Sequence, residues 1–202
     1  MAIQINGNGT ITGISVGGLP DGIVDTDMIA NSAVTTAKSS GLGTSTRTIG
    51  SEITLSNQST VDFTGFGTIT RAEVHVNALS CSNDTNWGIK IGTGGTPDSS
   101  GYLVTTGYEG SSENSDQNTG GFFTYGLASA AYATTGIFRF WRVANASHKW
   151  HCRADFQVYT AANYWFWING YRNLSGELDI IRVLPISGTF DSGHLRLVTY
   201  SD

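Results

Sequence analysis

The chain has 202 residues, 39% of them hydrophobic, which is enough for one principal domain with a sizeable core plus a smaller element. Only 13% of the residues are charged, which argues against amphipathic helices because these need Glu, Lys and Arg on their wet side. The abundance of Gly, Ser, Thr and Asn instead predicts an all-β protein with many turns. A net charge of −5 disfavours nucleic acid as a partner.

The first 16 residues have the pattern of a β-hairpin. Ile3, Ile5 and Ile11 share one parity, and the Asn-Gly pairs of residues 6–9 favour a tight turn between the two halves. This segment lacks the charged and apolar regions of a signal peptide, and no run of about 18 apolar residues follows it. We therefore expect no membrane insertion and assembly in a cytoplasm.

Residues 19–43 repeat with a period of ten, which superposes Val24 on Val34 and Thr26 on Thr36. The segment has few apolar groups, chiefly Val24, Met28, Ile29 and Val34. In a single chain, so few groups cannot offset an ordering entropy of roughly 1 to 2 kcal/mol per residue. We therefore predict that residues 1–43 form an attachment and trimerisation segment, in which these apolar groups pack against neighbouring copies.

Two conformations fit this repeat. In the first, each repeat is extended and then makes one helical turn capped by Thr26 or Thr36. In the second, one short helix runs from Asp27 to Lys38. Both leave an apolar stripe that needs partners.

The run GISVGGLPDGIVDTDMIANSAVTTAK, residues 13–38, resembles the V-T-T-A-K decads of tail-fibre and other virion proteins of tailed bacteriophages, especially marine and cyanobacterial ones. The ending GTFDSGHLRLVTY, residues 188–200, resembles the F-x-S-G-x-I-R-L-Y ending of β-domains at fibre tips, from which it departs at His194 and Val198. The resemblance implies a homotrimeric virion appendage that docks on other virion or tail proteins and carries a host-facing β-domain. A capsid-decorating, collar or tail protein without a receptor role is the alternative.

Residues 44–202 follow a Gly/Ser/Thr-rich hinge and have the pattern of a β-sandwich. About ten strand-like runs, most of them bounded by turn clusters, predict a jelly-roll-like sandwich. Period two is clearest in residues 73–77, 87–91 and 138–143. Residues 108–121 are predicted to form a long acidic and polar loop.

Candidate receptor contacts come from this loop and from a cluster of aromatic residues between 141 and 171. Aromatic faces stack on sugar rings while their polar edges form hydrogen bonds, so a host-surface polysaccharide is the expected ligand. Successive aromatic residues must face opposite sides of a sheet, so one set belongs to the core or to a protomer interface. The candidate receptor-binding residues are Tyr108, Glu109, Glu113, Asp116, Trp165 and Trp167. We expect Arg139, Arg142 and Arg153 together on the face opposite the core.

The sequence offers no convincing catalytic or metal site, and we predict a protein that is not an enzyme and needs no cofactor. Residues 13–17 match G-x-S-x-G but lack a following helix pattern, and glycine-rich residues 92–97 are best explained as a hairpin loop. His148, His151 and Cys152 are the most zinc-like group, yet a strand would place His151 opposite Cys152. Cys152 and the distant Cys81 are predicted to be free and buried rather than paired.

Overall fold

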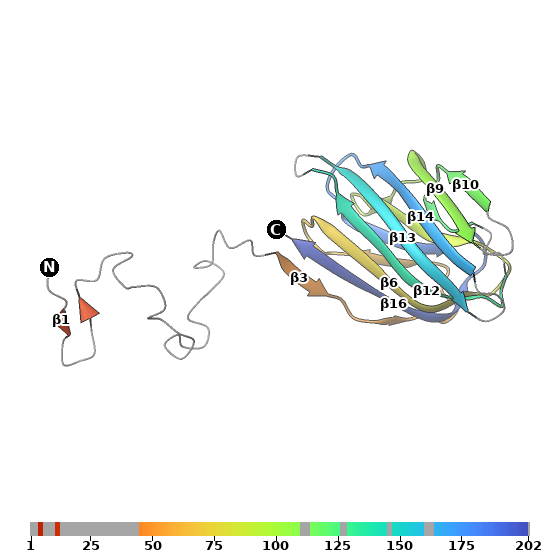
Figure 1. The fold of residues 1–202 in the computed structure, drawn as a ribbon, viewed down its shortest axis with the longest axis horizontal. Coiled ribbons are helices and arrows are strands. Elements are labelled where there is room, and N and C mark those ends of the chain that lie inside the picture. The colour runs from red at the N-terminus through yellow and green to blue at the C-terminus, as the bar shows by residue number, and fades with distance from the viewer. Residues whose placement is uncertain are drawn as a thin grey trace. The chain divides into compact units, whose positions relative to one another are not determined.

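The computed structural model (Figure 1) describes residues 4–5, 11–12, 45–109, 114–125, 129–144, 147–159 and 164–201. The chain forms two compact units, Met1–Thr44 and Ser45–Asp202, divided next to the predicted boundary between residues 43 and 44. The described residues form strands, turns and irregular segments but no helix. The all-β prediction is confirmed.

The predicted N-terminal hairpin is present in the first unit. Strands β1 (Gln4–Ile5) and β2 (Ile11–Thr12) pair antiparallel, with Ile5 opposite Ile11. The predicted trimerisation residues lie outside the described residues, so their role stays a prediction; they are Val24, Met28, Ile29 and Val34.

A nine-stranded sheet, the large sheet, dominates the second unit. Its order is β10-β9-β14-β13-β12-β6-β16-β3, and β4 also pairs with β16. Every pairing is antiparallel. Its strands are β3 (Thr46–Ile49), β4 (Ile53–Thr54), β6 (Arg71–Cys81), β9 (Tyr102–Glu109), β10 (Asn114–Asn118), β12 (Ala133–Arg142), β13 (Lys149–Tyr159), β14 (Tyr164–Asn173) and β16 (Phe190–Ser201).

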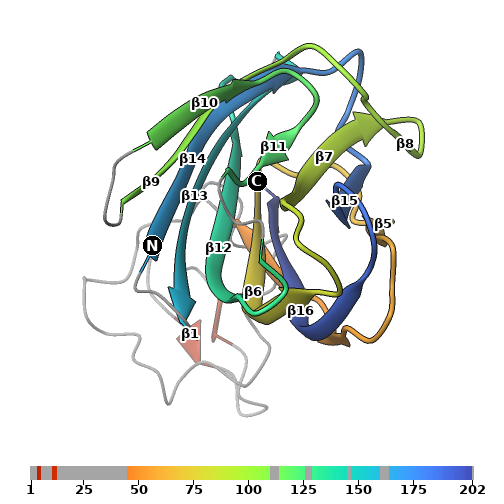
Figure 2. The same ribbon diagram turned by 90° about the vertical axis from the view of Figure 1, so that its right-hand side faces the viewer.

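A five-stranded small sheet packs against one side of the curved large sheet (Figure 2). Its order is β11-β7-β15-β5, with β8 paired to β7. The strands are β5 (Val61–Thr64), β7 (Trp87–Thr93), β8 (Thr96–Pro97), β11 (Phe122–Phe123) and β15 (Ile180–Pro185). The sandwich is therefore confirmed, while its jelly-roll connectivity stays a prediction.

Aromatic side chains join the two sheets in the core. The Trp87 ring of the small sheet meets three rings of the large sheet edge-on: Phe138, Phe156 and Phe190, at centroid distances of 5.7, 5.3 and 6.5 Å. Each such pair contributes about 0.5 to 1.5 kcal/mol beyond the burial of its apolar area. This cluster fixes the large sheet against the small sheet. The residues on the opposite side of the large sheet therefore have a rigid support.

Tyr102 makes the main polar link across the core. Its hydroxyl accepts a hydrogen bond from the Ile91 N–H at 3.0 Å and donates to the carbonyl oxygens of Ile91 and Asp98, which lie at 2.9 and 3.1 Å. Burial raises the pKa of Tyr102, so the hydroxyl keeps its proton. A fully satisfied buried hydroxyl fixes the position of β9 against β7.

Cys81 and Cys152 are free and buried, as predicted. Burial, assisted by Asp191, raises the pKa of Cys81 to about 12, and burial alone raises that of Cys152. Both thiols therefore remain protonated and unreactive in the folded chain.

The predicted loop over residues 108–121 is wrong in two places, because Tyr108 and Glu109 end strand β9 and five later residues form a strand of their own. Asn114–Asn118 form strand β10, which pairs with β9 from Asn118 opposite Val104 to Asn114 opposite Tyr108. The five residues of β10 are all polar, so no hydrophobic alternation indicated a strand. Backbone pairing with the exposed edge of β9 forms it instead, as is common for polar edge strands.

Candidate functional site

The side of the large sheet that faces away from the small sheet, here called the outer face, is the candidate functional site. It arises from simple alternation along β12, β13, β14 and β9. On β14, Phe166 and Ile168 are completely buried in the core, whereas Trp165 between β13 and β9 keeps 54% of its surface exposed. Within the Ser45–Asp202 unit, no described strand packs against this side of the sheet (Figure 2).

Strand pairing aligns the outer-face residues of β12, β13, β14 and β9 into four rows. The first row is Thr135, Gln157, Trp165 and Glu109, and the second is Ile137, Asp155, Trp167 and Gly107. The third row is Arg139, Arg153, Asn169 and Thr105, and the fourth is Trp141, His151, Tyr171 and Leu103. Successive rows are about 6.5 to 7 Å apart, because neighbours on one face are two residues apart along a strand. The face therefore alternates between aromatic and charged chemistry over about 20 Å.

The first two rows contain a hollow of about 410 Å³ beside Trp165, here called the Trp165 hollow. Its polar walls are Thr135, Asp155 and Gln157. An exposed indole next to amide, hydroxyl and carboxylate groups has the chemistry that recognises sugars, because the ring offers an apolar surface and its neighbours form hydrogen bonds.

The centre of the outer face is charged. The Asp155 carboxylate lies 3.3 Å from Nη1 of Arg139 and 3.5 Å from Nε of Arg153. One carboxylate between two guanidinium groups leaves an excess of positive charge, and the Arg153 side chain is 65% exposed. Arg142, which we expected here, instead lies on the inner side of the large sheet, which faces the small sheet. There it donates a hydrogen bond to the Glu177 carboxylate at 2.7 Å. That prediction is wrong because Arg142 has the opposite parity to Arg139.

The fourth row forms an aromatic stripe. The His151 ring lies between Trp141 and Tyr171, at centroid distances of 4.9 and 6.4 Å, and Nζ of Lys149 lies 3.8 Å from the centre of the Tyr171 ring. Burial and the charge of Lys149 lower the pKa of His151. The imidazole is therefore neutral at pH 7 and extends the apolar stripe instead of interrupting it.

The structure brings some of the predicted receptor-binding residues together and separates others. Trp165 lies opposite Glu109 in the strand register, and Trp167 follows on the same face. Tyr108 lies on the inner side, where its ring is 5.5 Å from Phe166 at the edge of the core. Glu113 lies outside the described residues, and of Asp116 only the backbone, in β10, is described.

Sequence reasoning missed the polar walls of the Trp165 hollow. Thr135 and Gln157 are isolated polar residues with no motif around them. They become neighbours of Trp165 because Thr135 pairs with Gln157 and Gln157 pairs with Trp165. The strand parity of Gln157 was readable from the sequence, but the register that joins three strands was not.

The motifs considered for chemistry have structural explanations where they are described. Residues 92–97 form the β7–β8 hairpin, in which Gly94 and Gly95 have positive φ and donate their N–H groups to the Asp179 carboxylate. His151 faces outward while Cys152 is buried in the core. Within the described ranges, no three His, Cys, Asp or Glu residues are grouped so that they could hold a metal ion. Residues 13–17 lie outside the described residues.

No protein-family model, curated protein or solved structure matches this chain. The part of the chain that the structure describes contains no helix long and apolar enough to cross a membrane.

Proposed function

We propose that this protein is a non-enzymatic bacteriophage virion appendage, a tail fibre, that binds a host-surface polysaccharide through the outer face of its large sheet. Residues 1–43 attach it to other virion or tail proteins and trimerise it. The sandwich, which we take to be jelly-roll-like, presents the Trp165 hollow and the aromatic stripe to the host surface.

The observation on which the proposal rests is the exposure of Trp165. A large aromatic side chain that keeps 54% of its surface in water, beside a polar hollow, is typical of a contact site rather than of a core. The aromatic stripe lies at the far end of the same face, so one extended ligand can reach both. An extended polymer fits this geometry better than a small molecule, which would need a deeper cavity.

A trimer makes weak contacts sufficient. Three identical outer faces, repeated over several fibres, convert individually weak binding into strong adsorption, because every contact after the first takes place at high effective concentration. This explains how an open face without a deep pocket can serve as a receptor-binding site.

A structural role in the virion is the second candidate, and the fourth row favours it. Leu103 and Trp141 are 55% and 38% exposed, and protein interfaces are enriched in such aromatic and aliphatic groups at their centres. In that case the outer face cements neighbouring virion subunits and contacts no receptor.

Adsorption of the labelled full-length protein to a panel of candidate host cells tests the proposal. We expect saturable adsorption that surface polysaccharide competes away and that Trp165→Ala weakens. Ile186→Ala is the matched control, because Ile186 is 60% exposed but follows β15 of the small sheet. Failure to adsorb to any host, together with binding to emptied capsids or tails, would establish the structural role instead.

A further inference from the structure

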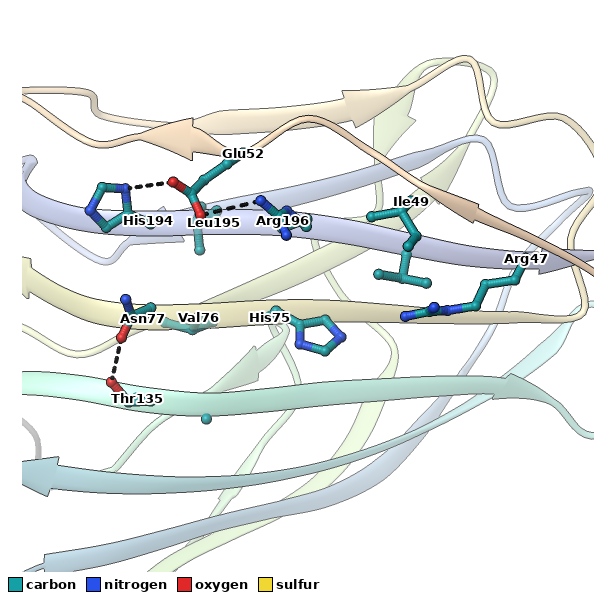
Figure 3. Close-up of a pocket in the computed structure, with 12 residues that line it drawn as sticks. Arg47, Ile49, Glu52, His75, Val76, Asn77, Thr135, His194, Leu195 and Arg196 are labelled. Carbon is teal, nitrogen blue, oxygen red and sulfur yellow. Dashed lines mark hydrogen bonds and ion pairs between the residues drawn. The ribbon is translucent and has the colours of Figure 1, made fainter.

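A second hollow of about 380 Å³ lies on the outer face, at the side of the large sheet formed by β3, β16 and β6 (Figure 3). Its walls include two arginines, two histidines and one acidic residue: Arg47, Arg196, His75, His194 and Glu52. We call it the cationic groove. This concentration of basic groups contrasts with the net charge of −5 of the whole chain.

The basic groups of this groove are only weakly compensated. Glu52 is shared between Nδ1 of His194 and Nη2 of Arg196, each at 3.4 Å, and is itself half exposed. The Arg47 side chain forms no ion pair or hydrogen bond with any residue that the structure describes, and it reaches over β6 toward His75 (Figure 3). The Arg47 guanidinium is therefore available to an anion from solution.

His75 belongs to a neighbouring network that supports the floor of the groove. Its Nε2 lies 3.3 Å from the Glu73 carboxylate, which also contacts Arg71. Burial opposes ionisation of Glu73, but the contacts with Arg71 and His75 outweigh it and lower the pKa. Glu73 is thus a fixed negative charge held by Arg71, His75 and the Tyr200 hydroxyl, and it does not pair with Arg47 or Arg196.

The cationic groove adjoins the Trp165 hollow. Thr135 of β12 lines both of them. The strand register also continues the second row of the outer face across β6 to β16, because Ile137 pairs with His75 and His75 with Arg196. At about 4.8 Å per strand, Arg196 lies about 19 Å from Trp167 along this row. One extended chain can occupy both hollows.

We infer that the cationic groove binds the carboxylate or sulfate groups of an acidic polysaccharide whose sugar rings stack on Trp165. This inference rests on the proposed function and adds the chemical class of the receptor. Arg47 and Arg196 recognise the planar or tetrahedral oxyanion through paired N–H donors, and Asn77, hydrogen-bonded to Thr135 at 3.4 Å, adds an amide beside them.

Affinity electrophoresis of the full-length protein tests the inference with three probes: polygalacturonate, dextran sulfate and neutral dextran. We expect retardation by at least one acidic polymer and none by dextran. Arg47→Gln and Arg196→Gln should each weaken the binding about three- to tenfold. The Arg47 side chain has no described ion pair or hydrogen bond, so its replacement removes a charge without breaking either, and an unchanged thermal midpoint confirms that the variant is folded.

Lys90→Gln is the matched control, because it removes the same charge from β7 of the small sheet and Lys90 does not line the groove. Equal losses of polymer binding in Lys90→Gln and Arg47→Gln would overturn the inference and show unspecific attraction to negative charge. Retardation by dextran equal to that by the acidic polymers would also overturn it, and so would no retardation by either acidic polymer. Adsorption to host cells that both arginine variants leave unchanged would overturn the inference and leave the proposed function standing. Adsorption to no host would refute the proposed function itself.

Discussion

Trp165 and Phe166 are sequence neighbours on opposite sides of β14, and their replacement by alanine should separate binding from stability. Phe166 is completely buried, so Phe166→Ala should lower the free energy of unfolding by about 3 to 5 kcal/mol. Trp165 buries a little under half of its surface, about 90 Å², which at about 25 cal/mol per Å² sets an upper limit of about 2 kcal/mol for its loss. We expect the stability cost of Trp165→Ala to remain below this limit.

The effect on binding follows from the exposed part of Trp165. The exposed 54% amounts to roughly 110 Å², of which a sugar ring stacked on one side covers about half. Covering this area contributes about 1.4 kcal/mol, so Trp165→Ala should weaken adsorption about tenfold. Trp165→Phe keeps a smaller aromatic face, so its affinity for host cells should lie between that of the unmodified chain and that of Trp165→Ala.

Two assays together check this reasoning: urea denaturation for stability and an adsorption isotherm on the host cell for binding. Phe166→Ala, measured where it remains folded, should lose stability and retain affinity. If Trp165→Ala binds host cells as tightly as the unmodified chain while both proteins are folded, the aromatic face is not the contact surface.

Three further predictions address assembly, pH dependence and the core. Replacing both Met28 and Ile29 with Ser should weaken the trimer, seen as a lower mass by light scattering, and leave the urea midpoint of the sandwich unchanged; a trimer of unchanged stability would remove their coupling role. Because burial and Lys149 lower the pKa of His151 from 6.5, the unfolded chain takes up a proton first as the pH falls, so stability should decrease as the pH falls below about 7. His151→Phe should make this decrease smaller. Urea denaturation at pH 7 and at pH 5 measures it, and an equal loss of stability in the variant and in the unmodified chain would contradict the prediction. Tyr102→Phe leaves the buried Ile91 N–H without its partner and should cost about 1 to 3 kcal/mol in urea denaturation, whereas no loss would show that the hydroxyl link is dispensable.

Much of the sandwich was predictable because its strands alternate regularly. In β13 and β14, buried Phe156, Phe166 and Ile168 alternate with exposed or half-buried Gln157 and Trp167, so both the strands and the separation of the aromatic residues follow from period two. The same rule, applied to Arg142, would have placed it away from Arg139.

The site was less predictable because it depends on pairing between distant strands. His75, Thr135 and Arg196 come from β6, β12 and β16, and no local pattern indicates that they share one face. Strand β10 was missed for a related reason, since its polar residues become a strand only by pairing with β9. Register is a property of the whole sheet, whereas alternation is a property of each strand.

The most direct test of the proposed function is the adsorption of labelled full-length protein to candidate host cells, with the oligomeric mass determined by light scattering in the same buffer. The proposal predicts a trimer that adsorbs saturably to at least one host and is displaced by that host's surface polysaccharide. A folded protein that adsorbs to no host, but coats emptied capsids or tails, would contradict it.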